Sequence, residues 1–265
     1  MRLISTPLGI LCLIATLITS VNAAENKPEK PHPLPAEKRA AYTSQFNTIV
    51  TVMTKKITTD PTQVQSYSQR ADAYFFLGKF KEAVADYEKM VKLDPKLNAS
   101  HWRRGIAYFY ATQFKQASHQ FEIYNSFDNV DRENGIWRFF SQGRAYGIKK
   151  ARKGLLKYKK DDREPFPDVY RLFSQGITGD AILKKITAAK ISDDEREKRF
   201  FYAQLYIGLN HALNDRNKLA IKHLREAVKN TWGPKAGYGP HYMWQVGRLH
   251  YELLTAKKKS IKTKK

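Results

Sequence analysis

Apolar side chains in the middle of the chain recur three and four residues apart, the spacing that places them on one face of a helix. The same arrangement returns every 34 residues in three consecutive windows that start at Val64. Such a period predicts a stacked array of structural repeats. The shared columns are Phe80, Phe114 and Ile148; Ala83, Ala117 and Ala151; Tyr87, Phe121 and Leu155; and Met90, Tyr124 and Tyr158.

Each window is long enough for two helices, and small side chains mark where those helices approach each other. Ala71 or Gly105 in the first helix and Ala83 or Ala117 in the second leave room for neighbouring large rings. Gly78 allows a tight turn between the helices of the first window. A single pair cannot bury its apolar face alone, so the pairs stack. No stretch alternates apolar and polar residues as a strand would, and the sequence therefore predicts an all-α solenoid.

Related signals extend the array in both directions. Asp60-Pro61 repeats Asp94-Pro95 at the same spacing, which indicates a degenerate half-repeat before Val64. Gly208 and Ala220 lie 12 residues apart, like the small residues of the second window, and indicate a further unit. The predicted organisation is a signal peptide (1–24), a Pro-rich linker (25–40), a degenerate N-terminal half-repeat (41–63), a repeat array (64–165, with units 64–97, 98–131 and a weak 132–165), a non-repeat helical insert (166–190), a further unit (191–231), a capping helix (232–256) and a basic tail (257–265).

The first 24 residues have the pattern of a secretory signal. Arg2 precedes an apolar stretch at 8–18, and Val21-Asn22-Ala23 ends in small or compact residues. A retained membrane anchor is the alternative, although the stretch is short for a bilayer. Leu11 precedes Cys12, where a lipid-attachment site requires a small residue. We therefore expect an exported protein that is soluble after cleavage, and the single cysteine excludes a disulfide scaffold.

The first unit, "ADAYFFLGKFKEAVADYEKMVKLDP", resembles the tetratricopeptide repeat (TPR). The order of parts resembles the NlpI family of bacterial envelope lipoproteins. "RGIAYFY", "FPDVYRLFSQGITGDAILKKI" and "FYAQLYIGLNHALNDRNKLAIKHLREAV" carry that likeness. It implies a TPR-type α-solenoid that is not an enzyme, forms dimers and serves as an adaptor for envelope proteases or peptidoglycan hydrolases. The lipid-bearing cysteine motif of that family is missing here.

The TPR resemblance also implies a concave face lined by the first helix of each pair. The positions it exposes are Gln65, Ser68, Asp72 and Phe75; Ala99, Trp102, Ile106 and Phe109; and Glu133, Ile136 and Phe140. Their aromatic and aliphatic members predict a groove for a protein or peptide partner. The candidate groove residues are Phe75, Trp102, Ile106, Phe109 and Phe140. In the alternative interpretation this stripe is core, covered by the N-terminal helix or by a sister subunit in a homodimer.

The chain is strongly basic, with a net charge of +22. A basic face is predicted from Lys149, Lys150, Arg152, Lys153, Lys157, Lys159 and Lys160, and the tail adds further lysines. A charge run is ordinarily a solvated helix face, but this one also suits an anionic envelope polymer or an anionic lipid surface. Binding of such a polyanion is the alternative function. The export signal argues against nucleic acid as the partner.

Nothing in the sequence points to catalysis. It contains no nucleophile elbow, zinc-protease motif, phosphate-binding loop or paired-cysteine motif, and we expect no cofactor and no metal. The paired carboxylates Asp193-Asp194 stand at a predicted helix start, where Ser192 and Glu195 have capping-box spacing. His211 falls in the column of two tyrosines and is predicted to be a packed, hydrogen-bonded helix residue.

Overall fold

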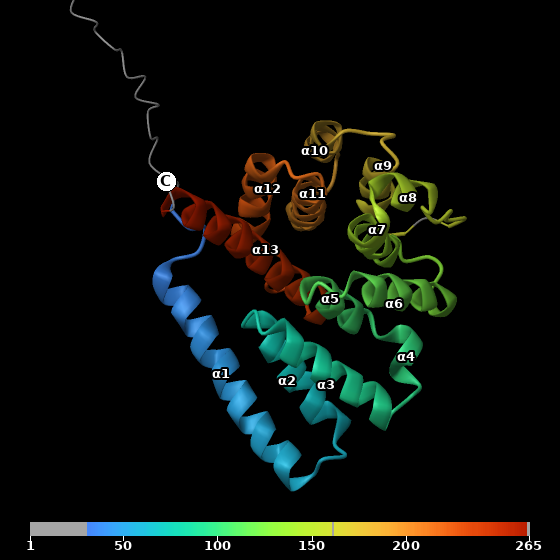
Figure 1. Cartoon of the computed structure of the whole chain (residues 1–265). Helices are drawn as coiled ribbons and strands as arrows, with labels where there is room; N and C mark the ends of the chain where they lie inside the picture. Colours follow the sequence, from blue (N-terminus) through green and yellow to red (C-terminus); the bar gives the residue numbers. More distant parts are fainter. Residues whose placement is uncertain (1–30, 161, 264–265) are drawn as a thin grey trace, which may run out of the picture. The chain divides into compact units, whose positions relative to one another are not determined.

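Thirteen helices and no strand occur in the part of the chain that the structure, a computed structural model, describes: residues 31–160 and 162–263 (Figure 1). The all-α prediction is therefore confirmed. The chain divides into two units, Met1–Pro31 and His32–Lys265, and the helices lie in the second. The predicted signal peptide and residues 25–30 of the predicted linker lie outside the described residues. The helices are α1 (Ala36–Thr59), α2 (Val64–Phe76), α3 (Phe80–Leu93), α4 (Leu97–Ser100), α5 (Trp102–Tyr110), α6 (Phe114–Phe127), α7 (Arg132–Tyr146), α8 (Ile148–Lys153), α9 (Phe166–Phe173), α10 (Gly179–Ala188), α11 (Asp193–Leu213), α12 (Asn217–Lys229) and α13 (Tyr238–Thr263).

Helix pairs α2–α3, α5–α6 and α11–α12 pack through the small positions of the repeat. Ala83 and Ala117 have no exposed surface. A Cβ atom added to Gly105 would lie 2.6 Å from Cζ of Phe121, and one added to Gly208 would lie 2.8 Å from Cγ of Leu224. The predicted contact between small and large side chains is therefore confirmed in both parts of the array.

The turns inside these three pairs share one backbone geometry. Gly78, Thr112 and Asp215 each adopt a positive φ, of 75°, 61° and 56°. Each turn closes with a hydrogen bond of 2.8–2.9 Å from the next residue's N–H: Lys79 to Tyr74 O, Gln113 to Tyr108 O and Arg216 to His211 O. The sequence indicated this turn only at Gly78, because residues with a side chain rarely adopt a positive φ.

The third unit departs from the predicted columns. Helix α8 has only six residues and ends at Lys153, so Leu155 and Tyr158 lie beyond it rather than in a second helix. The Tyr158 side chain nevertheless packs against the helical Gly135, and its hydroxyl donates a hydrogen bond of 3.2 Å to the carbonyl of Asp131. The third unit thus has the same kind of contact between a glycine and a large ring as the other units. Its ring, however, belongs to a segment that is not helical.

The insert consists of α9 and α10, which residues 174–178 separate. The last helix, α13, begins at Tyr238 and continues to Thr263, whereas the predicted capping helix ends at residue 256. The predicted separation of a tail at residue 257 is therefore corrected for residues 257–263. Lysine is a good helix former and positive charge is favourable at a helix carboxyl end, so the lack of an apolar period in residues 257–263 does not stop the helix.

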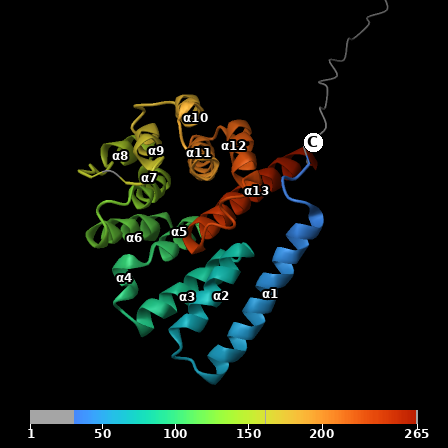
Figure 2. The same cartoon turned by 180° about the vertical axis from the view of Figure 1, so that it is seen from behind.

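Helix α13 packs against α12 and also against α2, which is far away in sequence (Figures 1 and 2). Its residues Tyr242, Trp244 and Val246 are at most 1% exposed and belong to the main apolar core. Helix α1 packs on α2, and Tyr42 of α1 lies 5.7 Å from the Trp244 ring. None of the helices in the described residues is long and apolar enough to cross a membrane.

Candidate functional site

Helix α13 fills much of the groove that the sequence predicted. The Tyr242 ring stacks 5.2 Å from Phe75 and meets Trp102 edge-on at 4.9 Å. Phe75, Ile106 and Phe140 are 0%, 1% and 2% exposed. The prediction that these three side chains are exposed is therefore wrong, and the alternative interpretation of the stripe as core holds for them.

The covering elements also differ from that alternative. Phe75 is covered by the C-terminal helix α13 rather than by the N-terminal helix. Phe140 packs on Phe173 of the insert at 5.3 Å and on Tyr206 of α11 at 6.4 Å. No local pattern signals these contacts, because the covering residues lie at least 33 positions away in sequence.

The two remaining members of the predicted stripe, Trp102 and Phe109, are half-buried and line different hollows. Trp102 lies with Ile106 in a pocket of about 450 Å³, which we name the groove pocket. Phe109 lies with Phe114 and His250 at another hollow of about 530 Å³. The structure therefore does not join the five predicted residues into one surface.

Five of the fifteen residues that line the groove pocket are aromatic. They come from α5, α6, α7, α11 and the segment before α13, so the pocket is assembled from helices that are distant in sequence. Three of the chain's four tryptophans take part. The lining residues are Trp102, Ile106, Tyr124, Asp131, Glu133, Asn134, Trp137, Arg163, Lys198, Tyr202, Trp232, Ala236, Gly239, Pro240 and Met243.

A charge cluster forms one wall of the groove pocket, with Glu133 half-buried and Arg163 exposed. Arg163 forms ion pairs with Glu133 and, at 3.6 Å, with Asp131, and the hydroxyl of Tyr206 donates a hydrogen bond to Glu133. Burial raises the pKa of Glu133 to about 7; Arg163 opposes this rise and Asp131 adds to it.

A second polar network ties α13 to the first two helix pairs. Asp72 accepts a hydrogen bond of 2.7 Å from Arg103 of α5 and further hydrogen bonds from the hydroxyls of Tyr87 and Tyr238. Asp72 was predicted on an exposed face, whereas the structure makes it a half-buried link between four helices. Tyr238 is 166 residues away, so sequence reasoning had no means of pairing the two.

The predicted basic face is only partly a surface. Lys149, Lys150, Lys153, Lys157, Lys159 and Lys160 are exposed, and none of them forms an ion pair within the described residues. Arg152 differs, because it is half-buried and its Nε donates a hydrogen bond of 3.3 Å to the carbonyl of Phe173. Arg152 is therefore removed from that face. The side chains of residues 257–265 lie outside the description.

Metal-binding groups do not gather in the described residues, where no three His, Cys, Asp or Glu side chains could hold one ion. The prediction for His211 is corrected in part. Its ring lies 5.4 Å from that of His223, but its Nδ1 atom is buried without a hydrogen-bond partner among the described residues.

Comparison with known proteins gives one family match. Residues 64–97, which are the first predicted unit and contain α2 and α3, match the model of the tetratricopeptide repeat. No curated protein matches the chain, so the NlpI-like order of parts is not confirmed by a homologue and stays a prediction. Tetratricopeptide repeats generally mediate protein–protein interaction, and their all-helical fold is typically non-catalytic. The match and the stacked helix pairs together identify an all-α solenoid of the tetratricopeptide type.

Proposed function

We propose that this protein is an exported, non-catalytic scaffold that binds a peptide segment of a protein partner in the groove pocket. The observation that carries the proposal is the pocket itself, of about 450 Å³, whose lining contains the half-buried Trp102 and Trp232 and the buried Trp137. Aromatic side chains at the centre of an interface contribute most of the binding energy in many complexes. The export part rests on the signal-like pattern of residues 1–24.

The lining of the groove pocket suits a segment with one apolar anchor flanked by polar groups. Trp102, Trp232 and Pro240 are half-buried apolar members of the lining, while Arg163 and Lys198 lie at the same wall as Glu133. Because Glu133 and Arg163 already pair with each other, the charged wall orients a ligand rather than attracting a strongly charged one. An envelope protease or peptidoglycan hydrolase fits the resemblance to the NlpI family, and a second copy of this chain is the competing occupant.

The test blocks the pocket without removing core contacts. Ala236→Arg places a long charged side chain at the lining from the half-buried segment before α13, and Tyr146→Ala changes an exposed ring that does not line the pocket. Both variants are crosslinked in the native host and the captured proteins are identified by mass spectrometry. We expect Ala236→Arg to lose about tenfold or more of the captured partner, since a hot-spot loss exceeds about 2 kcal/mol.

Equal capture of every protein by wild type and Ala236→Arg, with both folded by circular dichroism, would exclude the groove pocket as the binding site. Size-exclusion chromatography separates the two occupants. A change from dimer to monomer in Ala236→Arg would assign the pocket to a second copy of the chain.

The exposed lysines support a second candidate function, the binding of an anionic polymer or lipid surface. Six lysines between residues 149 and 160 lack an ion-pair partner among the described residues. Substituting Lys157, Lys159 and Lys160 by Gln should weaken binding to vesicles that contain anionic lipid and should make it less dependent on salt. Binding that does not change with ionic strength in wild type would rule this candidate out.

A further inference from the structure

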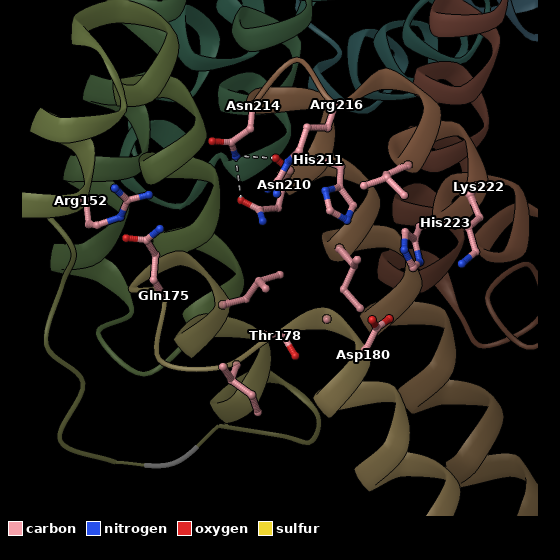
Figure 3. A pocket seen from close by; sticks show the side chains of 15 residues that line it. Arg152, Gln175, Thr178, Asp180, Asn210, His211, Asn214, Arg216, Lys222 and His223 are labelled. Atoms are coloured by element: carbon pink, nitrogen blue, oxygen red, sulfur yellow. Dashed lines mark hydrogen bonds between the residues drawn. The ribbon is translucent and has the colours of Figure 1, made fainter.

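A pocket of about 410 Å³ lies between the insert and the last helix pair (Figure 3). Its walls come from α8, the end of α9 with the following turn, the start of α10, α11, and α12 with the turn before it. The lining residues are Arg152, Leu172, Gln175, Ile177, Thr178, Gly179, Asp180, Ile207, Asn210, His211, Asn214, Arg216, Leu219, Lys222 and His223. We name it the insert pocket; it shares no residue with the groove pocket.

Positive charge surrounds the insert pocket from several elements. Arg152 reaches it from α8, Arg216 from the turn before α12, and Lys222 from α12 itself, and Figure 3 shows Arg152 on the opposite side from Lys222. The one carboxylate in the lining is Asp180, at the start of α10. Three cations around one anion leave an excess of positive charge in a partly enclosed polar space.

The remaining polar groups of the insert pocket offer hydrogen bonds. Gln175, Asn210 and Asn214 contribute side-chain amides, and Nδ2 of Asn214 donates to the backbone carbonyl of Asn210 at 2.7 Å. Gly179 brings the start of α10 against α11, because a Cβ atom there would lie 2.9 Å from Cγ2 of Ile207. The amino end of α10 adds a favourable dipole for negative charge.

We infer that the insert pocket binds a small oxyanion, a molecule that carries a phosphate or carboxylate group, between Arg152 on one side and Arg216 and Lys222 on the other. Guanidinium groups bind the two oxygens of such a group with paired hydrogen bonds, and lysine adds a point charge. The Asp180 carboxylate repels an anionic ligand and therefore lowers the affinity of the pocket for it. This site is independent of the proposed peptide-binding function.

The pKa values of two histidines in the insert pocket respond first to burial and then to the charges around them. The pKa of His211 is lowered to about 4, first by burial and then by Arg216, His223 and Lys222, against the opposing effect of Asp180. Burial and Lys222 also lower the pKa of His223, against Asp180 and Glu226. An oxyanion bound between these cations would offset part of their effect, so the pKa of His211 should rise when the ligand binds.

The test titrates the full chain with inorganic phosphate and, separately, with citrate at constant ionic strength, followed by calorimetry and by histidine NMR signals. Arg216→Gln and Lys222→Gln should each weaken binding about two- to fivefold, because both cations are exposed. Asp180→Asn should strengthen binding by a similar factor. Lys115→Gln, an exposed change of equal charge in α6 that does not line the pocket, should leave the affinity unchanged.

The direction of the Asp180→Asn effect separates the proposal from simple structural damage, because a damaged pocket would lose affinity. Binding of phosphate alone assigns the site to phosphoryl groups, and binding of citrate alone assigns it to carboxylates. The proposal is overturned if neither anion binds at millimolar concentration, or if Lys115→Gln weakens binding as much as Lys222→Gln does. A His211 pKa that stays constant on saturation would overturn it as well.

Discussion

Two interfaces of the array differ in how tightly they are packed. One lies between the first two helix pairs and the other between the insert and the last pair, and both contain a side chain from the same position of the repeat. At the first, Tyr108 of α5 is buried and its hydroxyl donates a hydrogen bond of 2.8 Å to Glu88 of α3. At the second, the same column holds His211 of α11, which lines the insert pocket. A repeat period therefore specifies where a side chain stands, while its size and its neighbour decide whether the interface closes.

Helix α13 adds to the difference. Tyr242 contacts Phe75 of the first pair and Trp102 of the second, and so covers their junction. At the insert, the facing helix α10 is ten residues long and begins at Gly179, with Asp180 and Thr178 at the pocket. A closed junction contributes to stability, whereas an open polar one is available for a ligand.

The largest expected effect comes from opening the closed junction. Tyr242→Ala removes a fully buried ring, and we expect a loss of about 3–5 kcal/mol in the free energy of unfolding, measured by urea denaturation. Leu253→Ala, a partly exposed change in the same helix, should cost within about 0.5 kcal/mol. Similar losses for the two variants would show that α13 does not cover the junction.

Packing inside the pairs should be equally tight in both regions. Ala117 in α6 and Ala220 in α12 are both fully buried, so Ala117→Leu and Ala220→Leu should each destabilise the protein by about 1–3 kcal/mol through overpacking. The exposed Gln116→Leu serves as the control and should stay within about 0.5 kcal/mol. If only one alanine variant is destabilised, the two regions do not share the same helix contact.

A substitution in the turns between paired helices should raise the free energy of unfolding, by a smaller amount than the preceding substitutions lower it. Thr112→Gly relieves a β-branched side chain at positive φ and should stabilise the protein by about 1 kcal/mol. Asp215→Gly should give less, because aspartate tolerates this backbone region better. Gly78→Ala is the reverse change and should destabilise. Thermal denaturation of the three variants measures the series, and a less stable Thr112→Gly would contradict the turn geometry.

The smallest effect concerns pH. The folded pKa of His211 lies near 4, below its usual 6.5, so the unfolded chain takes up the proton first as the pH falls. His211 therefore lowers stability progressively from pH 6.5 towards 4. His211→Tyr, which copies the closed interface, should reduce this loss, with an effect below about 1 kcal/mol because the ring is partly exposed. Parallel pH curves of urea midpoints for both proteins would contradict this role of His211.

The sequence by itself determined the helical class, the period and the contacts inside the pairs α2–α3, α5–α6 and α11–α12. Ala83, Ala117 and Gly105 could be placed because their partners lie within the same repeat, and a fixed spacing on two neighbouring helices defines which side chains meet. The family match at residues 64–97 covers the unit in which this pattern is clearest.

Only the tertiary structure decided which face of the array is open. Phe75 is buried because Tyr242, 167 positions further along the chain, returns to stack on it, and no local periodicity encodes such a return. Arg152 lines the insert pocket rather than the basic face for the same reason, since its neighbours belong to later helices. Helix periodicity reports which side of a helix is apolar, but the element that covers that side is selected by the packing of the whole unit.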